Sequence, residues 1–233
     1  MISILIPSIR PKELRLLLHD IENNTVQPDH VFVIDNSEEK IPFRDYSFNL
    51  HVYRFNVNVG PVWTWNLAFK FPCIFPTEYI CIMNDRIRVE KYMLEKFSRV
   101  LDNNKEVKVV CPTINLTKPF SETNGNDLVF DSIKWTKGNC AVFMFRKQYA
   151  IDTPSIPSEL FIYFNDNWLG LFTQPGEWVK LRNCFVKYDP GQKSESYIKW
   201  CRKMIRKERP IYTSFARKIV GDRKNEGSVF IHV

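Results

Sequence analysis

The stretch Tyr79-Ile80-Cys81-Ile82-Met83-Asn84-Asp85-Arg86-Ile87-Arg88-Val89 sets the interpretation of the whole chain. Its apolar and β-favouring residues predict a buried strand, which ends at the pair Asn84 and Asp85. Open α/β sheets bind their ligands beyond the carboxyl ends of parallel strands. Because an Asp after a strand is also a common turn residue, the neighbouring segments decide between a structural and a functional role for Asp85.

The segments around this strand alternate between strand and helix patterns. Residues 2–6 predict a strand, residues 12–23 a helix with one apolar face, and residues 31–34 a second strand. A strand, a helix and a strand in this order form a parallel βαβ unit. A third strand at residues 52–55 and a helix at residues 62–69 continue the alternation. The first half therefore predicts a mainly parallel sheet flanked by helices.

The second half is less regular. Residues 90–101 predict a helix, and residues 107–111, 138–145 and 178–187 predict strands. A helical pattern follows the polar run Asn165-Asp166-Asn167. The fold class expected from the whole pattern is α/β, with a mixed, mainly parallel sheet in a single domain.

The composition is that of a folded domain. A chain of 233 residues, of which 44% are hydrophobic, has enough apolar side chains for a packed core. No apolar run reaches the roughly 20 residues of a membrane-spanning helix, and the chain begins directly with a strand pattern rather than a signal peptide. The six cysteines lack the spacing of a zinc or redox site, so we expect reduced thiols. These features predict a cytoplasmic protein, or one of the host cytoplasm if the chain is viral.

The net charge of +7 is concentrated at the C-terminal end. Residues 191–233 contain eleven basic and four acidic residues, a surplus that equals the charge of the whole chain. Apolar residues recur there at helical spacing, at Tyr197, Trp200, Cys201, Met204 and Ile205. We expect a basic helical extension, which either packs on the domain, lies on an anionic membrane, or contacts the phosphates of a nucleic acid.

Polar residues follow three of the predicted strands. They are Pro7, Ser8 and Arg10 after the first strand, Asp35 and Asn36 after the second, and Asn84, Asp85 and Arg86 after the fourth. In a parallel sheet these ends share one edge and line one crevice. Asp35 can accept hydrogen bonds from a base or ribose, and Asp85 can hold a divalent cation. Because Arg10 or Arg86 can neutralise a diphosphate, the chemistry suggested is nucleotide binding.

Several enzyme classes are disfavoured by missing motifs. The sequence has no Gly-x-Gly-x-x-Gly after the first strand and no Gly-Lys-Ser/Thr loop, which argues against dinucleotide-binding enzymes and P-loop NTPases. It also has no serine elbow, and its four histidines lack metal-ligand spacing.

The order of these motifs resembles the GT-A fold glycosyltransferases, in particular the family-2-like group that uses nucleotide sugars. The resemblance spans about residues 2–187 and rests on five places: Ser3 to Ser8, Val33 to Ser37, Asn58 to Gly60 with Asn66, Met83 to Asp85, and Gly138 to Phe145 with Phe161 to Gly176. It implies a GT-A (Rossmann-like) catalytic domain over residues 1–190. Residues 1–104 would form its nucleotide-sugar-binding half, residues 105–190 its acceptor-binding half, and residues 191–233 the basic extension.

The resemblance also implies the reaction and the roles of single residues. The enzyme would move a hexose or pentose from a nucleotide-diphosphate sugar to an acceptor hydroxyl, with inversion. Asp166 would be the catalytic base, and Asp85 would hold Mg²⁺ or Mn²⁺ against the donor diphosphate. Asn58, Gly60 and Asn66 would join the strand-end residues in binding the donor. The implied acceptor-binding residues are Gly138, Asn139 and Trp168.

The chain departs from the family pattern around Asp85. Met83 stands where the first Asp of the metal motif belongs, and Arg86 follows Asp85 where the family often has an acid or a small residue. Three interpretations are open: Asp85 alone holds a cation, Arg86 and other basic groups neutralise the diphosphate, or the chain is a non-catalytic binding module. Asn165 replaces the usual Glu before the expected base.

The acceptor has two candidate identities. Some phage glycosyltransferases of this fold modify hydroxymethylated bases in DNA, and the chain resembles them in compactness. Such an enzyme needs aromatic side chains to hold an extruded base, and Trp63, Trp65, Trp135 and Trp168 are candidates that core packing also explains. The alternative is a lipid-linked or surface polysaccharide acceptor, reached by peripheral membrane contact of the basic extension.

Overall fold

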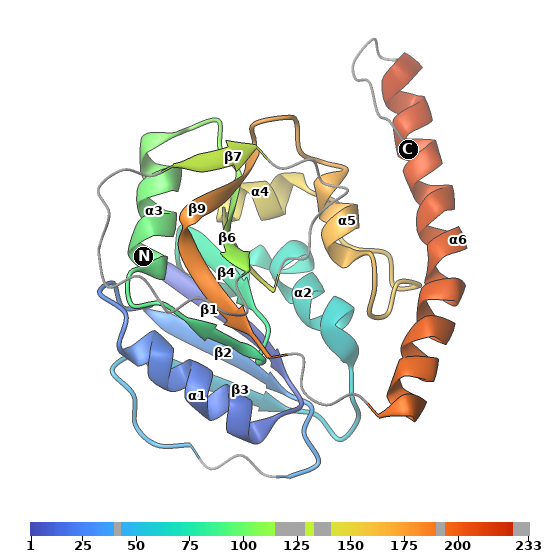
Figure 1. Cartoon of the computed structure of the whole chain (residues 1–233). Helices are drawn as coiled ribbons and strands as arrows, with labels where there is room; N and C mark the ends of the chain where they lie inside the picture. The colour runs from blue at the N-terminus through green and yellow to red at the C-terminus, as the bar shows by residue number, and fades with distance from the viewer. Residues whose placement is uncertain (40–42, 115–128, 133–140, 190–193, 226–233) are drawn as a thin grey trace.

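The structure is a computed structural model that describes residues 1–39, 43–114, 129–132, 141–189 and 194–225 (Figure 1). Gly138, Asn139 and Trp135 lie outside the described residues. The described part contains nine strands in one sheet: β1 (Ile2–Ser8), β2 (His30–Asp35), β3 (Asn49–Arg54), β4 (Tyr79–Met83), β5 (Ile87–Val89), β6 (Val109–Ile114), β7 (Phe130–Ser132), β8 (Val142–Arg146) and β9 (Trp178–Tyr188). Its helices are α1 (Pro11–Glu22), α2 (Gly60–Lys70), α3 (Met93–Asn103), α4 (Lys147–Asp152), α5 (Asn165–Gly170) and α6 (Glu195–Asn225), with a short 3₁₀ turn at Pro72–Ile74.

The strand order is β3-β2-β1-β4-β8-β6-β9-β5, with β7 beside β9. Strands β1 to β4 pair in parallel, whereas β8 runs antiparallel to both β4 and β6. The parallel half is the part in which strand and helix patterns alternate in the sequence, because parallel neighbours need a crossover connection. The expected mixed, mainly parallel α/β sheet flanked by helices is present.

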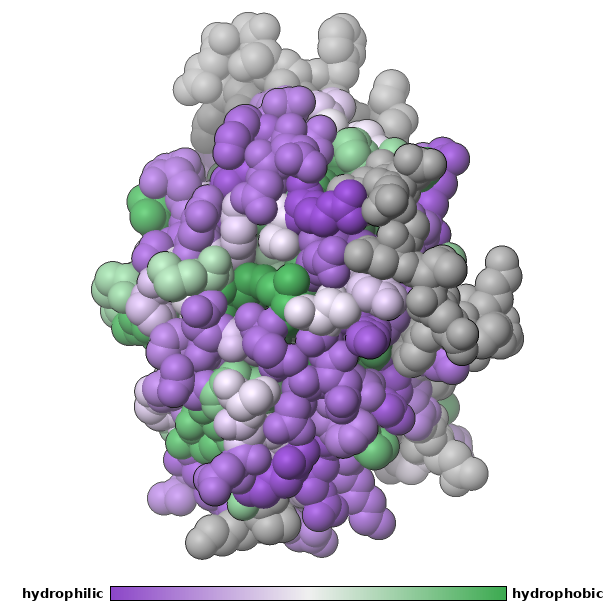
Figure 2. Space-filling view, turned by 90° about the vertical axis from the view of Figure 1, so that its left-hand side faces the viewer, coloured by the Kyte–Doolittle hydropathy of each residue, from purple (hydrophilic) through white to green (hydrophobic). Residues whose placement is uncertain are grey.

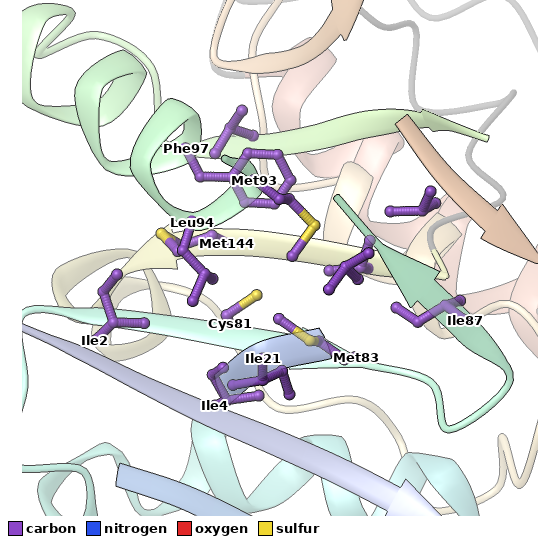
Figure 3. Packing of buried hydrophobic residues seen from close by; sticks show 14 of the residues in the cluster. Ile2, Ile4, Ile21, Cys81, Met83, Ile87, Met93, Leu94, Phe97 and Met144 are labelled. Atoms are coloured by element: carbon purple, nitrogen blue, oxygen red, sulfur yellow. The ribbon is translucent and has the colours of Figure 1, made fainter. Parts of the chain in front are cut away.

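Two apolar layers cover the two faces of the sheet, because neighbouring residues of a strand point to opposite faces. Ile4 and Cys81 pack against α1 and α3 on one face, and Leu5 and Ile82 pack against α2, α4 and α5 on the other. Figure 3 shows the first layer, where Met83 lies among Ile4, Ile21 and other apolar side chains. The alternation places Met83 in the core rather than at the edge of the sheet.

The stretch 79–89 contains two strands rather than the single strand that the sequence predicts. It forms β4, a turn at Asp85 and Arg86, and β5, which pairs antiparallel with β9 at Ile87↔Tyr188. Ile87 and Val89 are buried, so the apolar residues after the turn belong to a second strand of the sheet. The turn therefore follows the carboxyl end of β4 and links it to β5.

The basic extension forms α6, which continues through Pro210 and lies alongside α5 (Figure 1). Tyr212 is buried, and Phe215 and Ile219 pack against the same apolar layer as α5. Trp200, predicted on the apolar face, is 37% exposed. The contact of the helix with this apolar layer thus lies about five to seven turns after its first residue.

In the part of the chain that the structure describes, no helix combines the length and the apolar character needed to cross a membrane. Figure 2 shows the side that lies on the left in Figure 1. This face is mostly hydrophilic, and its hydrophobic residues form small patches.

Candidate functional site

The predicted strand-end residues meet at one edge of the sheet. Ser8 pairs with Asp35 in the register of β1 and β2. Asp85, two residues beyond β4, is only 7% exposed, and its Oδ2 accepts hydrogen bonds from the Ser8 hydroxyl and the backbone N–H of Ile9, both at 3.0 Å. Asp85 therefore joins the ends of β1 and β4.

The charge state of Asp85 reflects opposing influences. Burial raises the pKa of its carboxyl above the ordinary value of 3.8, which is the largest effect. The hydrogen bonds from Ile9 and Ser8 and the positive charges of Arg86 and Arg10 oppose this rise. Asp85 is thus a buried acid whose charged form is favoured first by these two hydrogen bonds and then by two nearby guanidinium groups.

Asp35 is buried and organises the loop after β2. Its Oδ1 accepts hydrogen bonds from the backbone N–H of Ser37, at 2.9 Å, and from the Ser37 hydroxyl. Arg54 of β3 lies 3.6 Å from Oδ2. The loop is tied to β1 because the backbone N–H of Asn36 donates to the Ser8 carbonyl at 2.7 Å.

The start of α2 is fixed by side chains that the sequence predicts to bind a donor. The Asn36 side-chain oxygen accepts from the N–H of Val59 at 3.1 Å, and that of Asn58 accepts from the N–H of Gly60 at 2.9 Å. Gly60 has φ of +77°, and a Cβ there would lie 2.8 Å from the ring of Phe161. Only glycine fits both this backbone conformation and this close approach.

Asn66 connects α2 to the second half of the chain. Its amide nitrogen donates to the carbonyl of Ile156, and its amide oxygen accepts from the N–H of Ile156, both at 2.8 Å. Together with the contact of Phe161 on Gly60, this pair holds the loop before α5 against α2. Residues of the predicted donor-binding half and of the predicted acceptor-binding half are therefore in direct contact here.

A hollow of about 400 Å³ lies between α2 and this loop. Its lining includes Trp63, Leu67, Phe71, Leu160 and Phe161. Trp63 is 41% exposed, whereas Trp65 is buried against Phe143 in the core. Of the two α2 tryptophans considered for holding a base, only Trp63 has a face available to a ligand.

Asp166, the expected base, lies in the first turn of α5 and is partly exposed. Its Oδ1 accepts a hydrogen bond from the N–H of Asn167 at 2.9 Å. Phe164, which precedes α5, has φ of +64°, a left-handed conformation that is uncommon for a bulky residue. Trp168 is buried and donates through its indole N–H to the carbonyl of Pro154, at 3.2 Å.

α6 supports the segment that carries Asp166. The fully buried carboxylate of Glu208 accepts hydrogen bonds from the N–H of Tyr163 at 2.8 Å and of Ile162 at 3.3 Å. The ring of Tyr212 stacks on Phe164 with centroids 5.1 Å apart, and Phe215 contacts Trp168 edge to face at 5.7 Å. These contacts lie on both sides of Asp166 and hold the strained Phe164 in place.

Tyr212 is a further polar group of this region. Burial raises the pKa of its phenol far above the ordinary value, and the Asp166 carboxylate adds to the rise. Its hydroxyl is buried and has no hydrogen-bond partner among the described residues. Sequence reasoning missed Tyr212 and Glu208, although their spacing of four residues places both on one face of a helix.

The residues at Asp85 do not fit a divalent cation. Met83 packs in the core, and Asp35 is engaged with Ser37 and Arg54. No group of three or more His, Cys, Asp or Glu residues suited to a metal occurs in the described part of the chain. Asp85 already accepts two hydrogen bonds, and the positive charges of Arg10 and Arg86 beside it repel a divalent cation.

Comparison with known proteins supports the fold. No protein-family model matches the sequence, and no curated protein matches it. The structure resembles crystal structures of S. aureus TarS. Against residues 1–349 in complex with UDP-GlcNAc, the TM-score is 0.60 at 13% identity, over 88% of this chain and 66% of that one. Against residues 1–349 in complex with UDP, the TM-score is 0.58 at 14% identity, over 81% and 61%.

The chain therefore spans about three fifths to two thirds of these TarS fragments, and 38% of a longer TarS structure that it matches with a TM-score of 0.56. At such low identity the likeness concerns the fold alone. It confirms the predicted fold class, a GT-A-like mixed α/β sheet flanked by helices.

Proposed function

We propose that this chain is a glycosyltransferase that moves a sugar from a nucleotide-diphosphate sugar to an acceptor hydroxyl. The observation that carries the proposal is the convergence of Ser8, Asp35 and Asp85 at the carboxyl edge of the parallel strands. Such an edge is where open α/β sheets bind nucleotides. The likeness of the whole fold to TarS, whose crystal structures contain UDP and UDP-GlcNAc, supports the same assignment.

In this proposal the donor lies along the edge formed by β1, β2 and β4. The loop after β2, held by Asp35 and Asn36, receives the nucleoside, and the turn at Asn84, Asp85 and Arg86 faces the diphosphate. Gly60 and Asn58 shape the start of α2 beside the donor. The contact of Phe161 with Gly60 brings the acceptor side next to the transferred sugar.

Asp166 acts as the general base. Its carboxylate takes the proton of the acceptor hydroxyl as the hydroxyl oxygen attacks the anomeric carbon. The bond from that carbon to the diphosphate oxygen breaks, and the nucleoside diphosphate leaves with the electron pair. Attack from the opposite side of the sugar gives inversion in a single displacement.

One feature of α6 favours an anionic acceptor. Arg202, Arg206 and Arg209 line a hollow on this helix together with Ile205 and Pro210. Because α6 also holds the Asp166 segment, an anionic acceptor bound along this arginine row would extend close to the base. We propose a hydroxymethylated base of DNA as the first acceptor to test, with a lipid-linked or surface polysaccharide as the alternative.

The donor assignment is tested by thermal unfolding of the full chain with UDP, GDP, CDP and dTDP, followed by the matching sugar nucleotides. We expect one nucleoside diphosphate to raise the midpoint of unfolding, and its sugar nucleotide to be consumed with hydroxymethylated DNA. Stabilisation without turnover on DNA or polysaccharide would favour a non-catalytic binding module. A flat response to every nucleotide would contradict the proposed donor site.

A further inference from the structure

Two arginines flank the acid that faces the proposed diphosphate site. Arg86 directly follows Asp85 in the turn between β4 and β5, and Arg10 follows Ile9, whose N–H donates to Asp85. Both guanidinium groups act electrostatically on the Asp85 carboxylate. Arg10 follows the end of β1 and Arg86 follows the end of β4, so two different strand ends supply the positive charges.

Arg10 is arranged to bind a further acceptor atom. It precedes α1, and its backbone N–H donates to the Ser8 hydroxyl at 3.3 Å. One guanidinium nitrogen pairs with Glu13 at 3.3 Å. The Nε is buried and has no hydrogen-bond partner among the described residues. The positive end of the α1 dipole lies beside it and also favours an anion.

The acids that would make a cation site are missing from the same place. The side chain of Met83 is fully buried in the layer facing α1 and α3. Asp35 is held by Ser37 and Arg54. A divalent cation placed at Asp85 would be repelled by both guanidinium groups, whereas a diphosphate would be attracted by them.

We propose that Arg10 and Arg86 neutralise the donor diphosphate in place of a divalent cation, so that this chain binds nucleoside diphosphates without metal. The inference rests on the proposed function and concerns the same site. Guanidinium groups form charge-assisted, often bidentate hydrogen bonds with phosphate oxygens. During transfer they would stabilise the negative charge that develops on the leaving diphosphate.

The test is calorimetric titration of the full chain with UDP, once in EDTA and once in Mn²⁺. We expect UDP to bind in EDTA with a dissociation constant within about twofold of that in Mn²⁺. Arg86→Ala and Arg10→Ala should each weaken UDP binding roughly 10- to 100-fold in EDTA. Arg15→Ala removes the same charge from an exposed position of α1 and should bind UDP as the unchanged chain does.

A second variant reverses the chemistry of the site. Arg86→Asp places a carboxylate next to Asp85, so it should lose UDP binding in EDTA and regain it with Mn²⁺. Thermal unfolding of each variant shows whether the fold is kept. UDP binding by the unchanged chain only with Mn²⁺ would overturn the inference and leave the proposed function standing. Absence of binding of UDP, GDP, CDP and dTDP under both conditions would contradict the donor site and the inference together.

Discussion

The carboxylate of Glu208, in the middle of α6, accepts a hydrogen bond from the backbone N–H of Tyr163 at 2.8 Å. This bond crosses from the C-terminal helix to the segment that leads into α5. Glu208 is fully buried although its neighbours on the helix are mostly basic and exposed. The helix is thereby anchored next to Asp166, rather than joined to the domain only through its first residues.

Removing this anchor should destabilise the fold. Glu208→Ala leaves the partly buried N–H groups of Ile162 and Tyr163 without their acceptor, which costs about 1–3 kcal/mol of unfolding free energy. Urea denaturation measures the loss, and amide hydrogen exchange at Ile162 and Tyr163 should become faster. Glu195→Ala removes an exposed acid of the same helix and serves as the control. Equal stability of the two variants would show that Glu208 does not hold the helix.

The hydroxyl of Tyr212 should matter for turnover but not for folding. Tyr212→Phe keeps the ring that stacks on Phe164 and removes a buried hydroxyl that has no partner among the described residues. Deleting an unsatisfied buried group leaves the unfolding free energy unchanged or raises it by up to about 1 kcal/mol. The Asp166 carboxylate acts electrostatically on this phenol, so we expect the hydroxyl to donate to the bound acceptor and its removal to lower turnover about tenfold. Turnover equal to that of the unchanged chain would restrict Tyr212 to packing.

Asp166 provides the sharpest test of the catalytic assignment. Asp166→Asn keeps the size of the side chain and the hydrogen bond from Asn167, but cannot take a proton. Sugar transfer should therefore fall by about 10²–10⁴, while the dissociation constant for UDP stays unchanged. Asp152→Asn alters an exposed acid of α4 and is the matched control. Full transfer by Asp166→Asn would assign the base to another residue.

The sequence predicts the parallel half of the fold because its signals are local. The strand at residues 2–6, the helix at residues 12–23 and the strand at residues 31–34 each carry their own periodicity. Short connections then determine how they pair. The polar residues at the strand ends follow from the same reasoning, and Ser8, Asp35 and Asp85 do meet at one edge.

Long-range contacts could not be predicted in this way. β5 has three residues, and its pairing with β9 depends on a partner almost a hundred residues away. The periodicity of the basic extension pointed to Trp200 and its neighbours as the buried face. Burial on α6 instead follows the shape of α5 and its preceding loop, which selects Glu208 and Tyr212. A buried Glu that accepts backbone N–H groups has no sequence signal of its own.

Removing one partner of a buried ion pair next to the sheet should destabilise the fold strongly. Lys96 lies 2.6 Å from Glu90, both are almost fully buried, and the Lys96 ammonium also donates to the Asn183 carbonyl at 2.7 Å. Lys96→Ala leaves the buried carboxylate of Glu90 without its ionic partner and should cost about 3–5 kcal/mol of unfolding free energy.

Urea denaturation measures this cost. The double variant Lys96→Met with Glu90→Met removes both charges and should lose less than the single variant. Lys199→Ala, which breaks an exposed pair with Glu195, should change stability by under about 1 kcal/mol. A loss of that small size for Lys96→Ala would mean that Glu90 is compensated by other groups.

The stability of the sheet edge should depend on pH through His51. Its ring stacks on Phe32 with centroids 4.7 Å apart, and its Nε2 lies 3.0 Å from the Nδ1 of His30. Burial, followed by the charge of His30, lowers the pKa of His51 below its ordinary value of 6.5. As the pH falls below 6.5, the unfolded chain takes up this proton before the folded chain does. The contribution of neutral His51 to the unfolding free energy is therefore fully present above pH 6.5, and it should be lost as the pH falls from 6.5 through the lowered pKa.

Urea denaturation between pH 5 and 8 measures how the unfolding free energy changes with pH. His51→Gln should flatten this slope, and His19→Gln, at an exposed position, should leave it unchanged. A slope that His51→Gln does not change would assign the pH dependence to other groups.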